Sequence, residues 1–122
     1  MPNVSKPVVL IVEDETLIRM VAVDAFLEAG FEVLEAEHAA HAIRVHASAT
    51  LVHVLFTDVN MPGELTGIDL AEHLKAQSAG LIVIVTSALP ILRSVDHLPA
   101  TFISKPYNAE SVSKAAMSLL AA

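Results

Sequence analysis

An aspartate at the end of a strongly apolar segment is the residue around which the chemistry of this sequence can be organised. Residues Leu51–Thr57 are mostly apolar, Asp58 follows at once, and the chain then turns at Pro62-Gly63. A short apolar run that ends in turn residues is typical of a strand buried on both faces, as in a parallel sheet covered by helices. Ligands bind such sheets at the carboxyl ends of the strands. We therefore predict that the Asp58 carboxylate is a nucleophile.

Two further carboxylates are predicted at the same edge of the sheet. Glu13 and Asp14 directly follow the apolar run Val8–Val12. Three carboxylates in one cleft repel one another and raise one another's pKa values unless a cation lies among them. Carboxylate oxygens are the ligands that a hard divalent ion such as Mg²⁺ prefers. The sequence therefore indicates a Mg²⁺ site at Glu13, Asp14 and Asp58.

A lysine and two hydroxyls follow the remaining strand-like runs. Lys105 comes after Thr101–Ser104, and Thr86 and Ser87 come after Leu81–Val85. A lysine can hold a phosphoryl oxygen and a hydroxyl can donate to one. Together with an aspartate nucleophile and a divalent ion, these groups describe transfer of a phosphoryl group onto a carboxylate. Neighbouring strand residues point to opposite sides, so we expect only one hydroxyl to face the phosphoryl group, with a slight preference for Ser87.

Strand-like and helix-like segments alternate along the whole chain. The expected strands are Val8–Val12, Phe31–Ala36, Leu51–Thr57, Leu81–Val85 and Thr101–Ser104, and the expected helices are Thr16–Ala29, Glu37–Ala47, Gly67–Gln77 and a last helix capped by Asn108. This alternation predicts an α/β fold, a flavodoxin-like doubly wound parallel sheet of five strands with helices on both faces. The less apolar second and fifth strands belong at the edges, which gives the order 2-1-3-4-5. Pro90–Pro99 is expected to be irregular or to hold one short helix.

Composition narrows the function classes. The 122 residues suffice for one domain, and a formal charge of −7 argues against a nucleic-acid surface. The absence of cysteine excludes disulfides and thiolate chemistry. No apolar run is long enough to span a membrane and the first residues do not resemble a signal peptide, so a cytoplasmic location is the default expectation.

These motifs together resemble the receiver domain of the response regulators of two-component signalling. The matching pieces are Val12-Glu13-Asp14-Glu15, Asp58-Val59-Asn60-Met61-Pro62-Gly63 with Gly67 following, the hydroxyl after the fourth strand, and Lys105-Pro106. The resemblance extends from Val8 to about Leu120, so residues 1–122 are expected to be a single CheY-like receiver domain. The chain departs from the family between Ser87 and Lys105, where the fourth-helix region is short and contains two prolines.

The resemblance implies a role for each matching residue. Asp58 is the implied phosphoacceptor. Glu13 and Asp14 are implied to hold Mg²⁺, Asp14 directly and Glu13 through water, and Asn60 lends its backbone carbonyl. Lys105 is implied to bind the phosphoryl oxygen, with a cis bond to Pro106. Phe102 matches the aromatic switch position of the family, although a core aromatic is the simpler interpretation of this residue.

The expected function is a phosphorylatable switch rather than an enzyme. Its implied phosphodonor is a histidine kinase or a histidine phosphotransfer protein, and it would signal through contact with a downstream protein. One alternative is a receiver-fold interaction module that is not phosphorylated, and another is a catalyst that acts on a small phosphorylated molecule through Asp58. The sequence leaves open whether the apolar helices pair into a homodimer.

Overall fold

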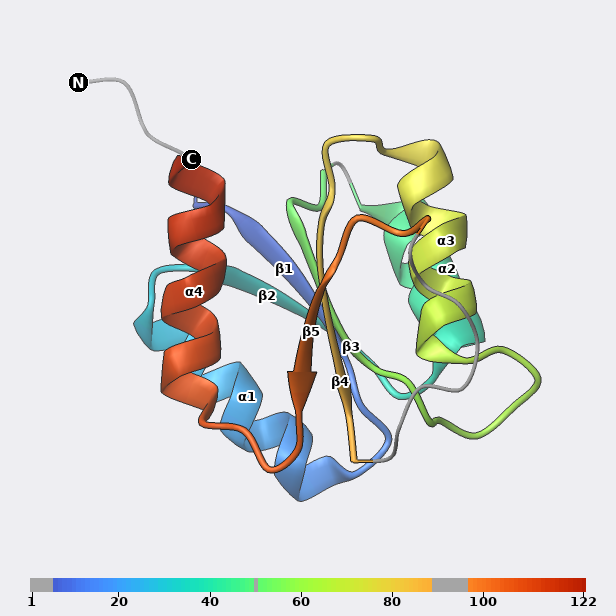
Figure 1. Ribbon diagram of the computed structural model, residues 1–122, viewed down its shortest axis with the longest axis horizontal. Helices are drawn as coiled ribbons and strands as arrows, with labels where there is room; N and C mark the ends of the chain where they lie inside the picture. The colour runs from blue at the N-terminus through green and yellow to red at the C-terminus, as the bar shows by residue number, and fades with distance from the viewer. Residues whose placement is uncertain (1–5, 50, 89–96) are drawn as a thin grey trace.

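A computed structural model describes residues 6–49, 51–88 and 97–122, which form a parallel sheet between two layers of helices (Figure 1). The strands are β1 (Val8–Val12), β2 (Glu32–Ala36), β3 (Val54–Asp58), β4 (Ile82–Ser87) and β5 (Thr101–Ser104). The helices are α1 (Thr16–Glu28), α2 (Ala39–Ser48), α3 (Gly67–Gln77) and α4 (Ala109–Ala121). The strand order is β2-β1-β3-β4-β5 and every pair is parallel. This confirms the predicted flavodoxin-like fold, including the two edge strands.

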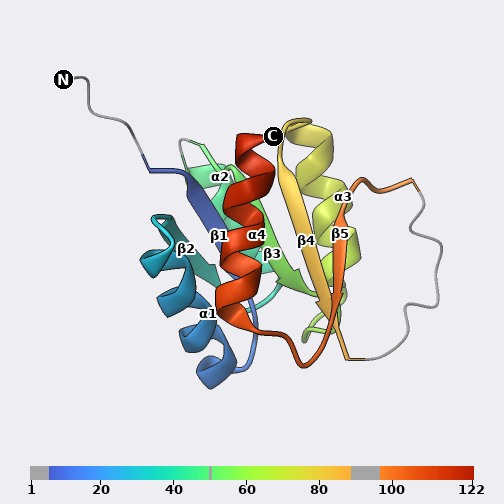
Figure 2. The ribbon, with the colours of Figure 1, turned by 60° about the vertical axis from the view of Figure 1, so that its left-hand side comes forward.

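The two faces of the sheet are covered by different helices. Figures 1 and 2 show α1 and α4 on one face, and α2 and α3 on the other. Because strand residues alternate between faces, the strands contribute alternate apolar side chains to two separate cores. The core under α1 and α4 contains Val9, Ile11, Val54, Phe56 and Ile84. The core under α2 and α3 contains Leu10, Val12, Leu55, Val83 and Val85.

Two histidines explain where two elements begin. We expected a helix from Glu37, but α2 begins at Ala39 because His38 is its N-cap and accepts a hydrogen bond from the His41 amide at 3.1 Å. We expected a strand from Leu51, but β3 begins only at Val54. The Val8 amide, which opens β1, donates to the His53 ring at 2.9 Å rather than to a backbone carbonyl. The His53 amide also donates to the Val8 carbonyl at 2.9 Å, so His53 joins the start of β1 to β3 through both its ring and its backbone.

The connection between β4 and β5 is described only in part. The prediction for Pro90–Pro99 falls mostly on residues 89–96, which lie outside the described residues, and residues 97–100 contain no helix. Leu98 is buried in the core under α2 and α3. After β5 the chain enters α4, whose first turn is capped by Asn108, as predicted; its side chain accepts from the Ser111 amide at 3.0 Å.

None of the helices in the described part of the chain is both long enough and apolar enough to cross a membrane.

Candidate functional site

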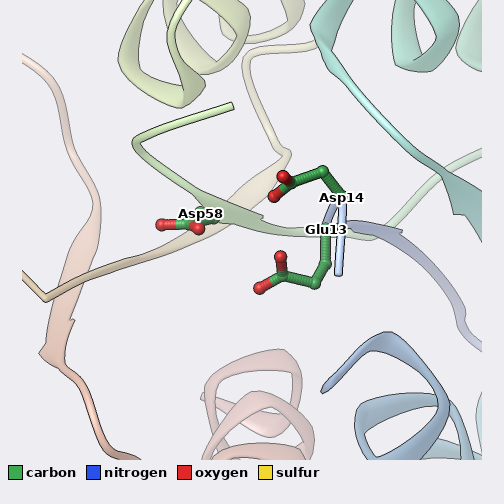
Figure 3. A group of neighbouring side chains, drawn as sticks. All are labelled: Glu13, Asp14 and Asp58. Carbon is green, nitrogen blue, oxygen red and sulfur yellow. The ribbon is translucent and has the colours of Figure 1, made fainter. Parts of the chain in front are cut away.

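Three carboxylates meet at the carboxyl edge of the sheet. Glu13 and Asp14 follow β1, and Asp58 is the last residue of β3, the strand next to β1. One carboxylate oxygen of each lies within 4.8 Å of the others, and Figure 3 shows the three side chains together at the strand ends, with Glu13 and Asp14 leaving the chain on opposite sides. Glu13 is only 4% exposed and Asp58 only 7%, whereas Asp14 is exposed. The predicted acidic cluster is therefore present.

Lys105 reaches this cluster from the other end of the chain. Its ammonium group donates to Asp58 Oδ2 at 2.9 Å and to Glu13 Oε1 at 3.3 Å. Its backbone amide donates to the Ser87 carbonyl at 3.0 Å, so the main chain is fixed just beyond β5. The bond to Pro106 is cis, as the resemblance implied. One lysine cannot neutralise three carboxylates, so the site keeps an excess of negative charge.

This excess charge and the burial of the site change the pKa values of Glu13 and Lys105. Burial is the main cause that raises the pKa of Glu13 above its usual 4.5; Asp14 and the charge of Asp58 add to the rise, and the Glu15 amide and Lys105 oppose it. Burial by itself lowers the pKa of Lys105, but its contacts with Asp58 and Glu13 outweigh burial and raise the pKa above 10.5. Lys105 is therefore a permanent cation at physiological pH.

The donor set fits a hard divalent cation. The cluster offers only carboxylate oxygens, two of them on nearly buried residues, at spacings that one ion can bridge. Oxygen donors of this kind, with room on the exposed Asp14 side for water, match the coordination that Mg²⁺ prefers. Asn60 lies exposed in the turn after β3, and the part assigned to its backbone carbonyl stays a prediction.

The strand register distinguishes the two candidate hydroxyls. Asp58 pairs with Thr86 across β3 and β4, and residues paired in this way point to the same face of the sheet. Ser87 points to the opposite face, toward the core under α2 and α3. Thr86 is only 2% exposed. The geometry therefore favours Thr86 over Ser87, the reverse of the slight preference drawn from the sequence.

The loop between β3 and α3 packs tightly against the acceptor. The Val59 amide donates to the Thr86 carbonyl at 2.9 Å, and the Gly67 amide donates to the Val59 carbonyl at 2.8 Å. A Cβ atom on Gly67 would lie 1.9 Å from the Asp58 carbonyl oxygen. Only glycine fits at this position, which explains why a glycine begins α3.

Of three side chains near the site, one was misinterpreted from the sequence and two were not identified from it. Phe102 is 38% exposed on the edge strand β5, so its interpretation as a core aromatic is wrong. Tyr107, which we did not single out, packs edge-on against Phe56 with ring centroids 5.4 Å apart. Arg19, also not singled out, donates to the Glu13 carbonyl oxygen at 2.7 Å. Neither Arg19 nor Tyr107 belongs to a motif, so no local signal identified them.

Comparisons with known proteins agree with this geometry. A family model described as the response regulator receiver domain matches residues 9–117. Chemotaxis protein CheY of Bacillus subtilis is 30% identical over 112 residues, which cover 88% of this chain and 92% of that protein. A cyclic di-GMP phosphodiesterase of Thermotoga maritima is 32% identical over 106 residues, which cover 84% of this chain but only 28% of that longer protein. Among solved structures, the response regulator TrrA of Thermotoga maritima in complex with Mg²⁺-BeF superposes with a TM-score of 0.79 at 22% identity, covering 93% of this chain and 98% of that one.

Gly67→Ala should destabilise the protein by about 1–3 kcal/mol, because the new methyl group must displace the Asp58 carbonyl or the start of α3. Urea unfolding measures the loss. Gly80→Ala is the matched control, since a Cβ at Gly80 meets no atom within 4 Å and its stability should barely change. Equal effects of the two substitutions would contradict the proposed close approach.

Glu13→Gln should stabilise the metal-free protein at neutral pH and weaken Mg²⁺ binding by about tenfold or more. Because the folded-state pKa of Glu13 is raised, the folded protein holds this proton more tightly than the unfolded chain. Its contribution to stability is therefore complete below about pH 4.5 and falls as the pH rises through the raised value. The same proton competes with Mg²⁺, so affinity should rise with pH across that window.

Thermal unfolding and calorimetric Mg²⁺ titration at several pH values check both expectations. Glu28→Gln, an exposed position on α1, is the control. A Glu13→Gln protein that is less stable without metal, or that binds Mg²⁺ as the parent does, would contradict them.

Proposed function

The chain belongs to the response regulator receiver family, and from this premise we propose that it is a phosphorylatable switch of a two-component phosphorelay with Asp58 as its phosphoacceptor. A receiver domain of this kind is not a catalytic enzyme. The observation that carries the proposal is the position of the Lys105 ammonium group, 2.9 Å from an oxygen of Asp58 and inside the cluster of three carboxylates.

The reaction uses groups of the chain in defined roles. An oxygen of the Asp58 carboxylate attacks the phosphorus of a phosphohistidine, a new O–P bond forms, and the N–P bond breaks with its electron pair returning to the imidazole. Lys105 binds an oxygen of the transferred phosphoryl group, and the Thr86 hydroxyl donates to another. Glu13, Asp14, Asp58 and the Asn60 carbonyl would hold Mg²⁺, which when bound would supply positive charge that offsets the charge of the phosphoryl oxygens. The related TrrA structure holds Mg²⁺-BeF, which supports this assignment.

The surface beside the acceptor supports a protein as the donor. A groove of about 510 Å³ runs from Lys105 past Tyr107 to α1, where Leu17 and Val21 are largely exposed. Apolar side chains that remain exposed in a patch are typical of protein contact surfaces. We propose that a histidine kinase or a histidine phosphotransfer protein in the cytoplasm covers this groove when it delivers the phosphoryl group.

The output of the switch is proposed to pass through β5. Phe102 pairs with Val85, the residue before Thr86, and its ring is partly exposed. When the Thr86 hydroxyl moves toward the phosphoryl group, the shift is passed along β4 to Val85 and to the Phe102 ring paired with it, so that a downstream protein can distinguish the two states. A receiver-fold interaction module without phosphorylation is the second candidate, and the first experiment below separates the two.

Incubation with acetyl phosphate should add one phosphoryl group to the protein only when Mg²⁺ is present, and Asp58→Asn should abolish the adduct. Intact-mass spectrometry measures it. Asp24→Asn, on an exposed part of α1, is the matched control and should be phosphorylated like the parent. An unmodified parent protein that also fails to bind Mg²⁺ would favour the interaction module.

Thr86→Val should slow phosphorylation by acetyl phosphate on the order of tenfold, because it removes a donor to a charged group and keeps the side-chain shape. Thr86→Ser keeps the hydroxyl and should retain most of the rate. The Ser87 side chain points to the other face of the sheet, so the Ser87→Ala protein should react like the parent. A slow Ser87→Ala protein beside a normal Thr86→Val protein would assign the role to Ser87 instead.

A further inference from the structure

Arg19 joins three elements beside the acidic cluster without belonging to it. From α1, its guanidinium donates through Nη1 to the Glu13 carbonyl oxygen at 2.7 Å. Through Nε it donates to Glu35 Oε1 on β2 at 3.1 Å. The Arg19 side chain is only 12% exposed, whereas that of Glu35 is half-exposed. An arginine used in this way fixes two oxygens with one planar group.

The carbonyl that Arg19 holds belongs to the peptide between two of the three carboxylates. Successive side chains of an extended strand point to opposite sides, so Glu13 and Asp14 can converge on one space only if the peptide between them is turned. That peptide is planar, and fixing its oxygen fixes the direction in which Asp14 leaves it. The Glu13 amide is fixed as well, through a 3.1 Å bond to the Ala36 carbonyl of β2.

We propose that Arg19 is a positioning residue for the cation site, and that Glu35 orients Arg19. The inference rests on the proposed function, because it assumes that Glu13, Asp14 and Asp58 hold Mg²⁺. Arg19 touches none of the three carboxylate groups in the described contacts; it acts through the main chain. Its removal leaves the ligands present but lets the Glu13–Asp14 peptide rotate, so the ligands no longer converge.

The alternative is that Arg19 only fastens α1 to β2. The two interpretations differ in one measurable respect. A fastening role changes folding stability and leaves metal affinity unchanged in the protein that remains folded. A positioning role changes metal affinity beyond any change in stability. The two quantities therefore have to be measured on the same variants.

The experiment combines calorimetric titration with MgCl₂ and urea unfolding of the metal-free protein. Arg19→Gln should raise the Kd for Mg²⁺ by roughly tenfold or more, the usual effect of losing a partner that orients a ligand. Arg19→Lys should also bind more weakly than the parent, because a single ammonium lacks the planar fork that holds both oxygens. Glu35→Gln, at a half-exposed position, should keep the fold and give a smaller rise in Kd. Arg44→Gln, an exposed arginine on α2, should match the parent.

Several outcomes would overturn the inference. Unchanged Mg²⁺ affinity in Arg19→Gln, with stability reduced, would show that Arg19 only attaches α1 to β2. Should Arg19→Gln fail to fold, parent-like affinity in both Arg19→Lys and Glu35→Gln would reject the proposal, and weaker binding in them would support it. A parent protein that does not bind Mg²⁺ would remove the proposed function itself, a result distinct from a parent that binds while the Arg19 variants bind equally well.

Discussion

Mutual repulsion among three carboxylates is the constraint on which the site depends. Glu13, Asp14 and Asp58 bring oxygens within 4.8 Å of one another, and two of these residues are nearly buried. A folded chain tolerates this only when the backbone holds the acids in place and cations offset their charge. The parallel sheet holds the acids in place by bringing separate strand ends to one edge. Lys105, 92 residues after Glu13, offsets part of their charge. The remaining charge favours a divalent ion.

Much of this arrangement could be predicted because its causes are local. Apolar runs that end in charged or hydroxyl residues indicate strands and their functional ends, and the relative polarity of the runs separates central strands from edge strands. The Asn108 cap and the strand order followed from such patterns and are confirmed. The meeting of Glu13, Asp14 and Asp58 followed as well, since parallel strands must end at a common edge.

The remaining features depend on contacts between distant parts of the chain. Whether Thr86 or Ser87 faces Asp58 is decided by how β3 and β4 are paired. The sequence of β4 does not show this register, because Thr86 and Ser87 are neighbouring hydroxyl residues. In the sequence, Arg19 is one of the few polar residues in a mostly apolar helix. Its partners in the structure lie directly after β1 and on β2. The exposure of Phe102 follows from the edge position of β5, which leaves one side of that strand uncovered in the described part of the chain.

Tyr107 gives this protein an optical property. It is the single tyrosine, and the chain contains no tryptophan. Its ring rests against Phe56, two residues before the acceptor, and burial together with the charge of Glu13 raises its pKa. Nearly all of the absorbance and emission above 280 nm therefore arises from one chromophore beside the site. Any ion, phosphoryl group or partner that changes the local charge or solvation there is reported by the unlabelled protein through its own spectrum.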